Sequence, residues 1–176
     1  NSQHYAAVTV YDPHSDVATA LLNNCLVVPQ HELLVKAVDF SCYEKNSKIY
    51  LVAPDAGALK KSEKALSFLN EQGLELQFGL LLATKHRDTK TGEIVGTKLH
   101  DVPSDMELAH TLIIDDICDG GRTFIELNRI IVEHKPLSTS LYVTHGIFSK
   151  GMDFVKERGS FSNIFATFNW TTGDFK

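Results

Sequence analysis

The sequence has few cysteines and prolines and no long apolar run. Its three cysteines, Cys25, Cys42 and Cys118, are widely spaced without a CxxC pair, which argues against a disulfide framework and against a zinc site. We expect reduced, buried thiols. No run approaches the roughly 20 apolar residues needed to cross a bilayer, and the polar start NSQHY is not a signal peptide. We therefore expect a cytoplasmic protein with no membrane partner.

Positive charge is also scarce. The chain carries 17 Lys and Arg against 22 Asp and Glu, a formal net charge of −5. Because neutralising phosphates along a nucleic acid takes a surplus of Lys and Arg, we expect no nucleic-acid partner. Any anionic ligand must be bound by local donors. With 43% hydrophobic residues and only 5 prolines, the composition is that of an ordinary folded protein.

Short apolar runs recur along the chain, each followed by a turn and then a helix-like pattern. Because these runs are continuous rather than alternating, they indicate strands covered on both faces. We therefore predict an α/β fold, with a mostly parallel sheet flanked by helices. The predicted strands are residues 6–11, 48–53, 78–83, 111–115, 141–145 and 163–168.

Helical stripes of apolar residues lie between several of these runs. They comprise Val17 and Leu21, then Leu59, Leu66 and Leu69, then Phe124, Leu127 and Ile131. Gly73 is expected to follow the second helix, and Pro136 to stop the third. Residues 88–93 indicate a turn leading to a further strand over 94–99, and residues 100–107 an exposed loop.

In an open α/β sheet, ligands bind outside the carboxyl ends of the strands. The run ending at Ile114 leads into three aspartates and two glycines before the next helix. Glycines let the backbone curl so that several N–H groups point at one anion, and the helix N-terminus favours negative charge. The aspartates suit sugar hydroxyls or the water shell of Mg²⁺. The candidate residues are Asp115, Asp116, Asp119, Gly120, Gly121, Arg122 and Thr123.

Plainer interpretations of this segment stay open. Asp119 could simply cap the helix, with Asp115 and Asp116 solvated, because Asp and Gly are common after strands. No GxxxxGK[ST] or GxGxxG pattern is present, so neither a P-loop nor a dinucleotide fingerprint competes with a phosphate site.

Three other strand ends carry candidate residues. Small residues at 55–58 could form a second anion cradle with an aspartate facing a metal, or an ordinary helix start. Cations at 85 and 87 could neutralise charge during phosphoryl transfer, or lie on a solvated mobile loop. A histidine at 14 is more often capping or buried than a ligand. These candidates are Asp55, Ala56, Gly57, Ala58, Lys85, Arg87, Asp12 and His14.

Five segments together carry a family resemblance. TLIIDDICDGGRT resembles the diphosphate-sugar signature of the type I phosphoribosyltransferase fold. TVYDPHSD, VAPDAG, KHR and VTHGIFSKG are similar to segments of the ribose-phosphate diphosphokinases, in that family's order. The resemblance covers nearly the whole chain but only about the second half of the family, and the segment that holds ATP in the family lies upstream. It implies the tail of an N-terminal phosphoribosyltransferase-like domain at 1–30 and a C-terminal domain at 31–176.

The resemblance implies Mg²⁺-dependent transfer of diphosphate from ATP to the C1 hydroxyl of ribose 5-phosphate, giving phosphoribosyl diphosphate and AMP. Lys85 and Arg87 would be catalytic, residues 55–58 would bind diphosphate, and Asp115, Asp116 and 119–123 would bind ribose 5-phosphate. The implied Mg²⁺ ligands are Asp12, His14, Asp55 and Asp115.

Two alternatives are a phosphoribosyltransferase that attaches a base, and a non-catalytic homologue or fragment that binds phosphoribosyl diphosphate. The chain starts at Asn1 rather than Met, so we expect a processed or shortened chain. An exposed half-domain at its start suggests a homo-oligomer.

Overall fold

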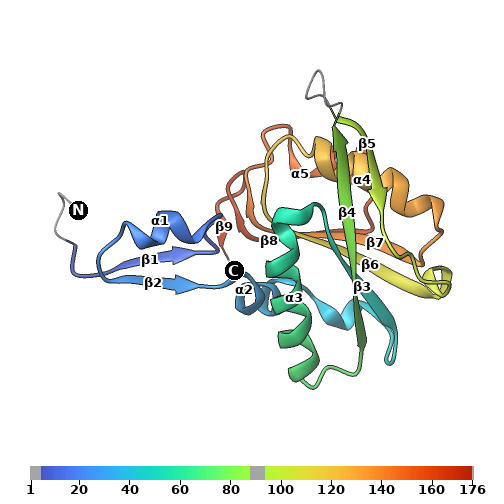
Figure 1. Ribbon diagram of the computed structural model, residues 1–176, viewed down its shortest axis with the longest axis horizontal. Helices are drawn as coiled ribbons and strands as arrows, with labels where there is room; N and C mark the ends of the chain where they lie inside the picture. Colours follow the sequence, from blue (N-terminus) through green and yellow to red (C-terminus); the bar gives the residue numbers. More distant parts are fainter. Residues whose placement is uncertain (1–4, 88–93, 176) are drawn as a thin grey trace.

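The computed structural model describes residues 5–87 and 94–175 (Figure 1). Its main body is a seven-stranded sheet in the order β5-β4-β3-β6-β7-β8-β9. The central strands run parallel, whereas the two outermost strands are antiparallel to their neighbours. The strands are β3 (Lys48–Ala53), β4 (Gln77–Arg87), β5 (Ile94–Leu99), β6 (Ala109–Cys118), β7 (Ser138–Gly146), β8 (Asn163–Asn169) and β9 (Asp174–Phe175).

Helices cover both faces of this sheet, as the continuous apolar runs predicted. Ile113 of β6 packs in a core with Leu127 of α4 (Arg122–Glu133) and Val155 of α5 (Met152–Gly159). Its neighbours on the strand point to the other face, where they pack in a second core with α2 (Gln30–Ala37) and α3 (Ala56–Glu71). Successive strand residues point to opposite faces, so one strand supplies two cores. The predicted fold class is confirmed.

The first part of the chain forms a separate structure that we call the N-terminal arm, residues 5–29. Strands β1 (Val8–Tyr11) and β2 (Cys25–Val28) pair in parallel as their own two-stranded sheet, joined through the short helix α1 (Asp16–Ala20). The arm projects from one side of the body in Figure 1. The predicted apolar stripe of α1 is not buried here, since Val17 is 70% and Leu21 76% exposed.

Several local predictions can be compared with the structure. Gly73 follows α3 with φ +67°, and Pro136 comes soon after α4 ends, as expected. The prediction of an exposed loop over 100–107 is wrong in part, because Met106, which begins the short 3-10 helix η2 (Met106–Leu108), is only 2% exposed. Strand β2 was not predicted, and neither was η1 (Phe40–Cys42).

The three cysteines are free thiols, as expected, but only Cys118 is buried, and Cys42 is exposed. The expectation that all three are buried is therefore wrong. In the described parts of the chain, no helix has the length and apolar character that crossing a bilayer would require.

Candidate functional site

Strand β6 carries the paired aspartates. The strand was predicted over 111–115, with its apolar run ending at Ile114, but this end is wrong because pairing with β7 continues up to Cys118. Asp115 and Asp116 therefore lie within the strand, on opposite faces of the sheet. The strand backbone, rather than a loop, sets where their carboxylates point.

Asp115 is partly buried, and its Oδ1 accepts a hydrogen bond from the Asp116 N–H at 2.9 Å. Burial, together with the negative charges of Asp116 and Asp55, raises the pKa of Asp115 to about 7. The side chain can therefore change its protonation state near neutral pH.

The loop after β6 turns through two glycines into α4. Gly121 has φ +75°, and a Cβ at this position would lie 2.6 Å from Cγ2 of Val155. Both the backbone conformation and the space therefore require glycine. Gly121 also holds the cap position of α4, whereas Asp119 accepts a hydrogen bond from the Ser149 N–H at 3.3 Å. The interpretation of Asp119 as the helix cap is not what the structure shows.

The first turn of α4 has the chemistry of an anion site. The backbone N–H groups at the start of a helix have no acceptor within the helix, and the helix dipole favours negative charge at this end. Thr123 lies in this turn. The Arg122 side chain is 90% exposed, and its Nε donates to Glu126 Oε1 at 2.7 Å. The predicted binding of ribose 5-phosphate by 119–123 stays a prediction.

Asp12, which directly follows β1, is a buried candidate residue, with 3% of its surface exposed. Its Oδ1 accepts from Lys61 Nζ at 2.8 Å. Its Oδ2 accepts from Thr144 Oγ1 at 2.6 Å and from Gln30 Nε2 at 3.0 Å. A buried carboxylate needs such partners, and here they come from α3, β7 and α2.

His14, in the turn after β1, reaches the main sheet. Its Nδ1 lies 2.7 Å from Oδ2 of Asp116, and Lys61 Nζ lies 3.3 Å from the same oxygen. We call Asp12, His14, Lys61 and Asp116 the junction cluster. Burial would lower the pKa of Lys61, but its hydrogen bond to Asp12 and the charges of both carboxylates outweigh burial and raise it. Lys61 is charged in this site.

Sequence reasoning missed Lys61, Gln30 and Thr144. Lys61 is six positions after Asp55 on the same helix, and Thr144 precedes His145 in the VTHG segment. His145 Nε2 lies 3.0 Å from the Tyr11 carbonyl oxygen. Thr144 lies within the VTHGIFSKG segment, but Lys61 and Gln30 lie outside the segments that carry the family resemblance, and nothing in the sequence indicated the partners of the three residues.

Asp55 caps α3. Its Oδ1 accepts hydrogen bonds from the N–H groups of Gly57 at 3.0 Å and Ala58 at 3.2 Å. The ordinary helix start is therefore present, and two amides of the predicted cradle over 55–58, which also includes Ala56, already bind the Asp55 carboxylate. The predicted diphosphate role of this turn stays a prediction.

The backbones of Lys85 and Arg87 lie in β4, opposite Thr97 and Ile94 of β5. The predicted strand over 94–99 is confirmed and pairs antiparallel with β4, and Lys85 and Arg87 belong to the paired strand β4 rather than to a loop. Their side chains, and residues 88–93, lie outside what the structure describes. The catalytic role predicted for the two cations stays a prediction.

The predicted Mg²⁺ ligands do not come together. Asp12 and His14 belong to the junction cluster, Asp55 caps α3, and Asp115 lies on β6 with its Oδ1 on a backbone amide. Among the residues that the structure describes, no group of three or more His, Cys, Asp or Glu side chains is arranged to hold a metal ion. The described residues therefore form no ready-made metal site, and the predicted binding of Mg²⁺ stays a prediction.

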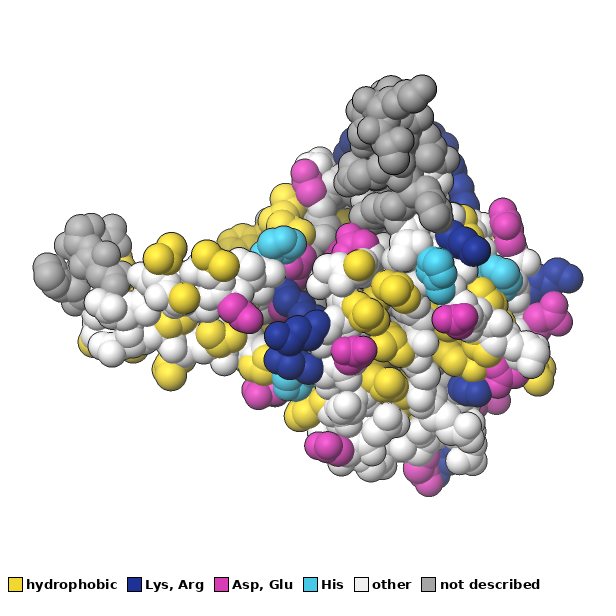
Figure 2. Space-filling view, viewed as in Figure 1, with side chains coloured by type: hydrophobic (Ala, Val, Ile, Leu, Met, Phe, Trp, Pro, Cys, Tyr) yellow, Lys and Arg dark blue, Asp and Glu magenta, His cyan; other side chains and the backbone are white. Residues whose placement is uncertain are grey.

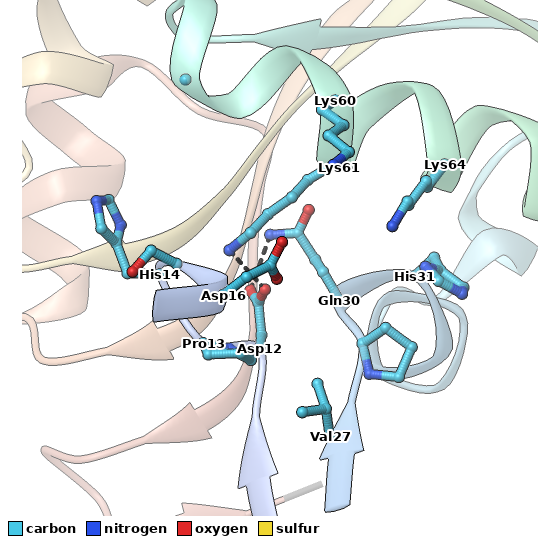
Figure 3. Close-up of a pocket in the computed structure, with 13 residues that line it drawn as sticks. Asp12, Pro13, His14, Asp16, Val27, Gln30, His31, Lys60, Lys61 and Lys64 are labelled. Atoms are coloured by element: carbon cyan, nitrogen blue, oxygen red, sulfur yellow. Dashed lines mark hydrogen bonds and ion pairs between the residues drawn. The ribbon is translucent and has the colours of Figure 1, made fainter. Parts of the chain in front are cut away.

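A pocket of about 220 Å³ lies between the arm and α3, beside the junction cluster. Figure 2 shows Lys and Arg side chains gathered where the arm meets the body. In Figure 3, Lys60, Lys61 and Lys64 extend from α3 beside Gln30 and His31. Burial lowers the pKa of His31, which packs against Phe68 with ring centroids 4.8 Å apart. The pocket is therefore lined both by lysine side chains of α3 and by carboxylates of the arm.

Comparison with curated proteins finds two informative relatives. Ribose-phosphate pyrophosphokinase 4 of Arabidopsis thaliana is 28% identical over 130 residues, which are 73% of this chain and 34% of the relative. Ribose-phosphate pyrophosphokinase 3, chloroplastic, of Oryza sativa subsp. japonica is 32% identical over 103 residues, 58% of this chain and 22% of the relative. The matched region thus spans about a third or less of either relative's length.

Solved structures share the fold. The phosphoribosylpyrophosphate synthetase from Mycobacterium smegmatis has a TM-score of 0.63 at 16% identity, over 89% of this chain and 46% of that chain. The orotate phosphoribosyltransferase from Aeropyrum pernix has a TM-score of 0.56 at 11% identity, over 81% and 70%. The family scan matches the phosphoribosyl transferase domain over residues 28–174. The chain therefore belongs to the phosphoribosyl transferase domain family.

Proposed function

We propose that this chain is part of an enzyme that transfers diphosphate from ATP to the C1 hydroxyl of ribose 5-phosphate, releasing AMP. The observation that carries the proposal is the contact between His14 of the arm and Asp116 of β6, at 2.7 Å. It brings the segment after β1 to the same sheet edge as the paired aspartates. Two relatives, 28% and 32% identical to parts of this chain, are named ribose-phosphate pyrophosphokinases.

The proposed sugar site lies at the end of β6. Asp115 and Asp116 accept hydrogen bonds from the ribose hydroxyls, and the amides of 119–123 with the Thr123 hydroxyl hold the 5-phosphate. The left-handed backbone at Gly121 and the α4 N-terminus support this assignment, because a turn of this kind and a helix N-terminus can present several N–H donors to one anion.

The proposed nucleotide side uses the remaining predicted residues. The diphosphate replaces the Asp55 carboxylate on the Gly57 and Ala58 amides, and Lys85 and Arg87 stabilise the charge that develops on the transferred oxygens. When bound with the nucleotide, Mg²⁺ would neutralise phosphate charge. We assign it no preformed protein ligands, because no group of three or more His, Cys, Asp or Glu side chains among the described residues is arranged to hold a metal ion.

We further propose that the arm is the tail of an N-terminal domain over residues 1–30 and that the protein acts as a cytoplasmic homo-oligomer. The exposed apolar side chains of the arm support the second point, because unpaired apolar surface favours association. Besides Val17 and Leu21, these side chains include Leu26, which is 61% exposed.

Phosphorus NMR of the chain with ATP, ribose 5-phosphate and Mg²⁺ tests the proposed reaction. Appearance of AMP and a new anomeric diphosphate signal is expected, and a Lys85→Ala variant should slow both on the order of 10³-fold or more. If no product forms although ribose 5-phosphate binds, the chain is a binding fragment or a non-catalytic homologue. Release of diphosphate from phosphoribosyl diphosphate only when a base is added would instead identify a phosphoribosyltransferase.

A further inference from the structure

Lys61 stands between two carboxylates that come from distant parts of the chain. Its Nζ lies 2.8 Å from Asp12 Oδ1 and 3.3 Å from Asp116 Oδ2. The carboxylates are enclosed, with side chains 2% and 10% exposed, and the lysine side chain is 29% exposed. Solvent screens such a partly buried ion pair much less than it screens one at the surface.

Other donors share these two carboxylates with Lys61. Oδ2 of Asp12 accepts from Thr144 and Gln30, and Oδ2 of Asp116 contacts His14 Nδ1 as well as Lys61. Mg²⁺ needs oxygen ligands at about 2.0–2.1 Å in near-octahedral geometry. A divalent ion bound to either carboxylate would displace these donors and would lie close to the lysine ammonium, and like charges repel strongly at such short range.

We propose that Lys61 is the resident cation of the junction cluster, and that Asp12, His14 and Asp116 bind no divalent metal ion while Lys61 is in place. This differs from the sequence prediction, in which Asp12 and His14 are metal ligands. It rests on the contacts of Lys61 and does not depend on the proposed reaction.

A substitution of Lys61 distinguishes the two assignments. Lys61→Met keeps most of the side-chain length but removes the positive charge. It leaves two carboxylates, a ligand type that suits Mn²⁺, close together beside an imidazole. The variant is therefore expected to gain a metal site that the natural chain lacks.

The test is titration of Mn²⁺ into the chain without substrate, followed by calorimetry and by the electron paramagnetic resonance signal of free Mn²⁺. Lys61→Met is expected to bind Mn²⁺ at least tenfold more tightly than the natural chain, and adding Asp12→Asn should remove the gain. Lys64→Met, on the same helix and the same pocket, is the matched control and should behave like the natural chain. So should Lys61→Arg, which keeps the charge.

Lys61→Met could also loosen the arm, so a second measurement leaves the lysine in place. The His14 side chain is 91% exposed, and His14→Ala should therefore fold normally. With Lys61 present, this variant is expected to leave Mn²⁺ affinity unchanged. A tenfold loss of Mn²⁺ affinity in His14→Ala, or a natural chain that binds Mn²⁺ as tightly as Lys61→Met, would overturn the proposal. Circular dichroism confirms the fold of each variant.

Discussion

His14 and Asp116 are 102 positions apart in the sequence, yet His14 Nδ1 lies 2.7 Å from Asp116 Oδ2. The contact fastens the turn after β1 to the strand that carries the paired aspartates. Lys61 reaches the same Asp116 oxygen from α3, so arm, helix and sheet meet at one carboxylate. The proposed sugar site and the arm are therefore structurally coupled.

Gly121→Ala is expected to destabilise the fold by about 2 kcal/mol or more, because alanine disfavours the left-handed backbone and its Cβ would approach Val155. Urea unfolding measures the change. Gly120→Ala is the matched control, since nothing lies within 4 Å of a Cβ there, and it should cost less than about 1 kcal/mol. Equal losses in both variants would contradict the requirement for glycine at 121.

Asp115 makes stability depend on pH. Its pKa is raised to about 7 in the folded chain, so the folded state binds more protons than the unfolded state between about pH 4 and pH 7. Its contribution to the free energy of unfolding therefore falls as pH rises through this range and levels off above it. Asp115→Asn removes the titrating carboxyl group. The variant should therefore be more stable than the natural chain at pH 8, but not at pH 4.

Urea unfolding of both proteins at several pH values tests this expectation. The quantity compared is the difference in the free energy of unfolding between the two proteins, because the contributions of other titrating groups cancel in this difference. A difference that stays constant from pH 4 to pH 8 would show that Asp115 titrates normally.

Thr144→Val is expected to lower the free energy of unfolding by about 1–3 kcal/mol, because it removes the hydroxyl that donates to the buried Asp12 carboxylate at 2.6 Å. Thr144→Ser keeps the hydroxyl and serves as the control. Hydrogen exchange should show faster exchange in β1 for the valine variant than for the serine variant. Identical exchange in the two variants would mean that this hydrogen bond does not hold the arm.

Thr123→Val is expected to weaken ribose 5-phosphate binding by about 10- to 150-fold, because a hydroxyl donor to a charged phosphate contributes about 1.5–3 kcal/mol. Arg122→Ala should change affinity much less, since the Arg122 side chain is 90% exposed and pairs with Glu126. Calorimetric titration compares the two. A larger loss of affinity in Arg122→Ala than in Thr123→Val would indicate that the arginine side chain, rather than the α4 amides, binds the phosphate.

Much of the fold could be predicted from local patterns. The continuous apolar run at 48–53 is a strand over those same residues, and glycines and prolines mark the ends of α3 and α4. The end of β6 could not be predicted this way, because pairing with β7 carries the strand through two aspartates that by composition resemble a loop. Strand β2 was missed for a similar reason, since it is short and pairs only with β1.

The sequence by itself determined the α/β class, the glycine turn before α4 and the residue types at the strand ends, because these follow from apolar periodicity and backbone freedom over a few neighbouring positions. Only the tertiary structure decided which charges meet. Lys61 contacts Asp12 and Asp116 at separations of 49 and 55 positions, and packing of α3 and the arm against the sheet sets those contacts. A carboxylate's partner depends on this packing, so Asp12, which the family resemblance implied as a metal ligand, is paired with a lysine that the sequence did not indicate.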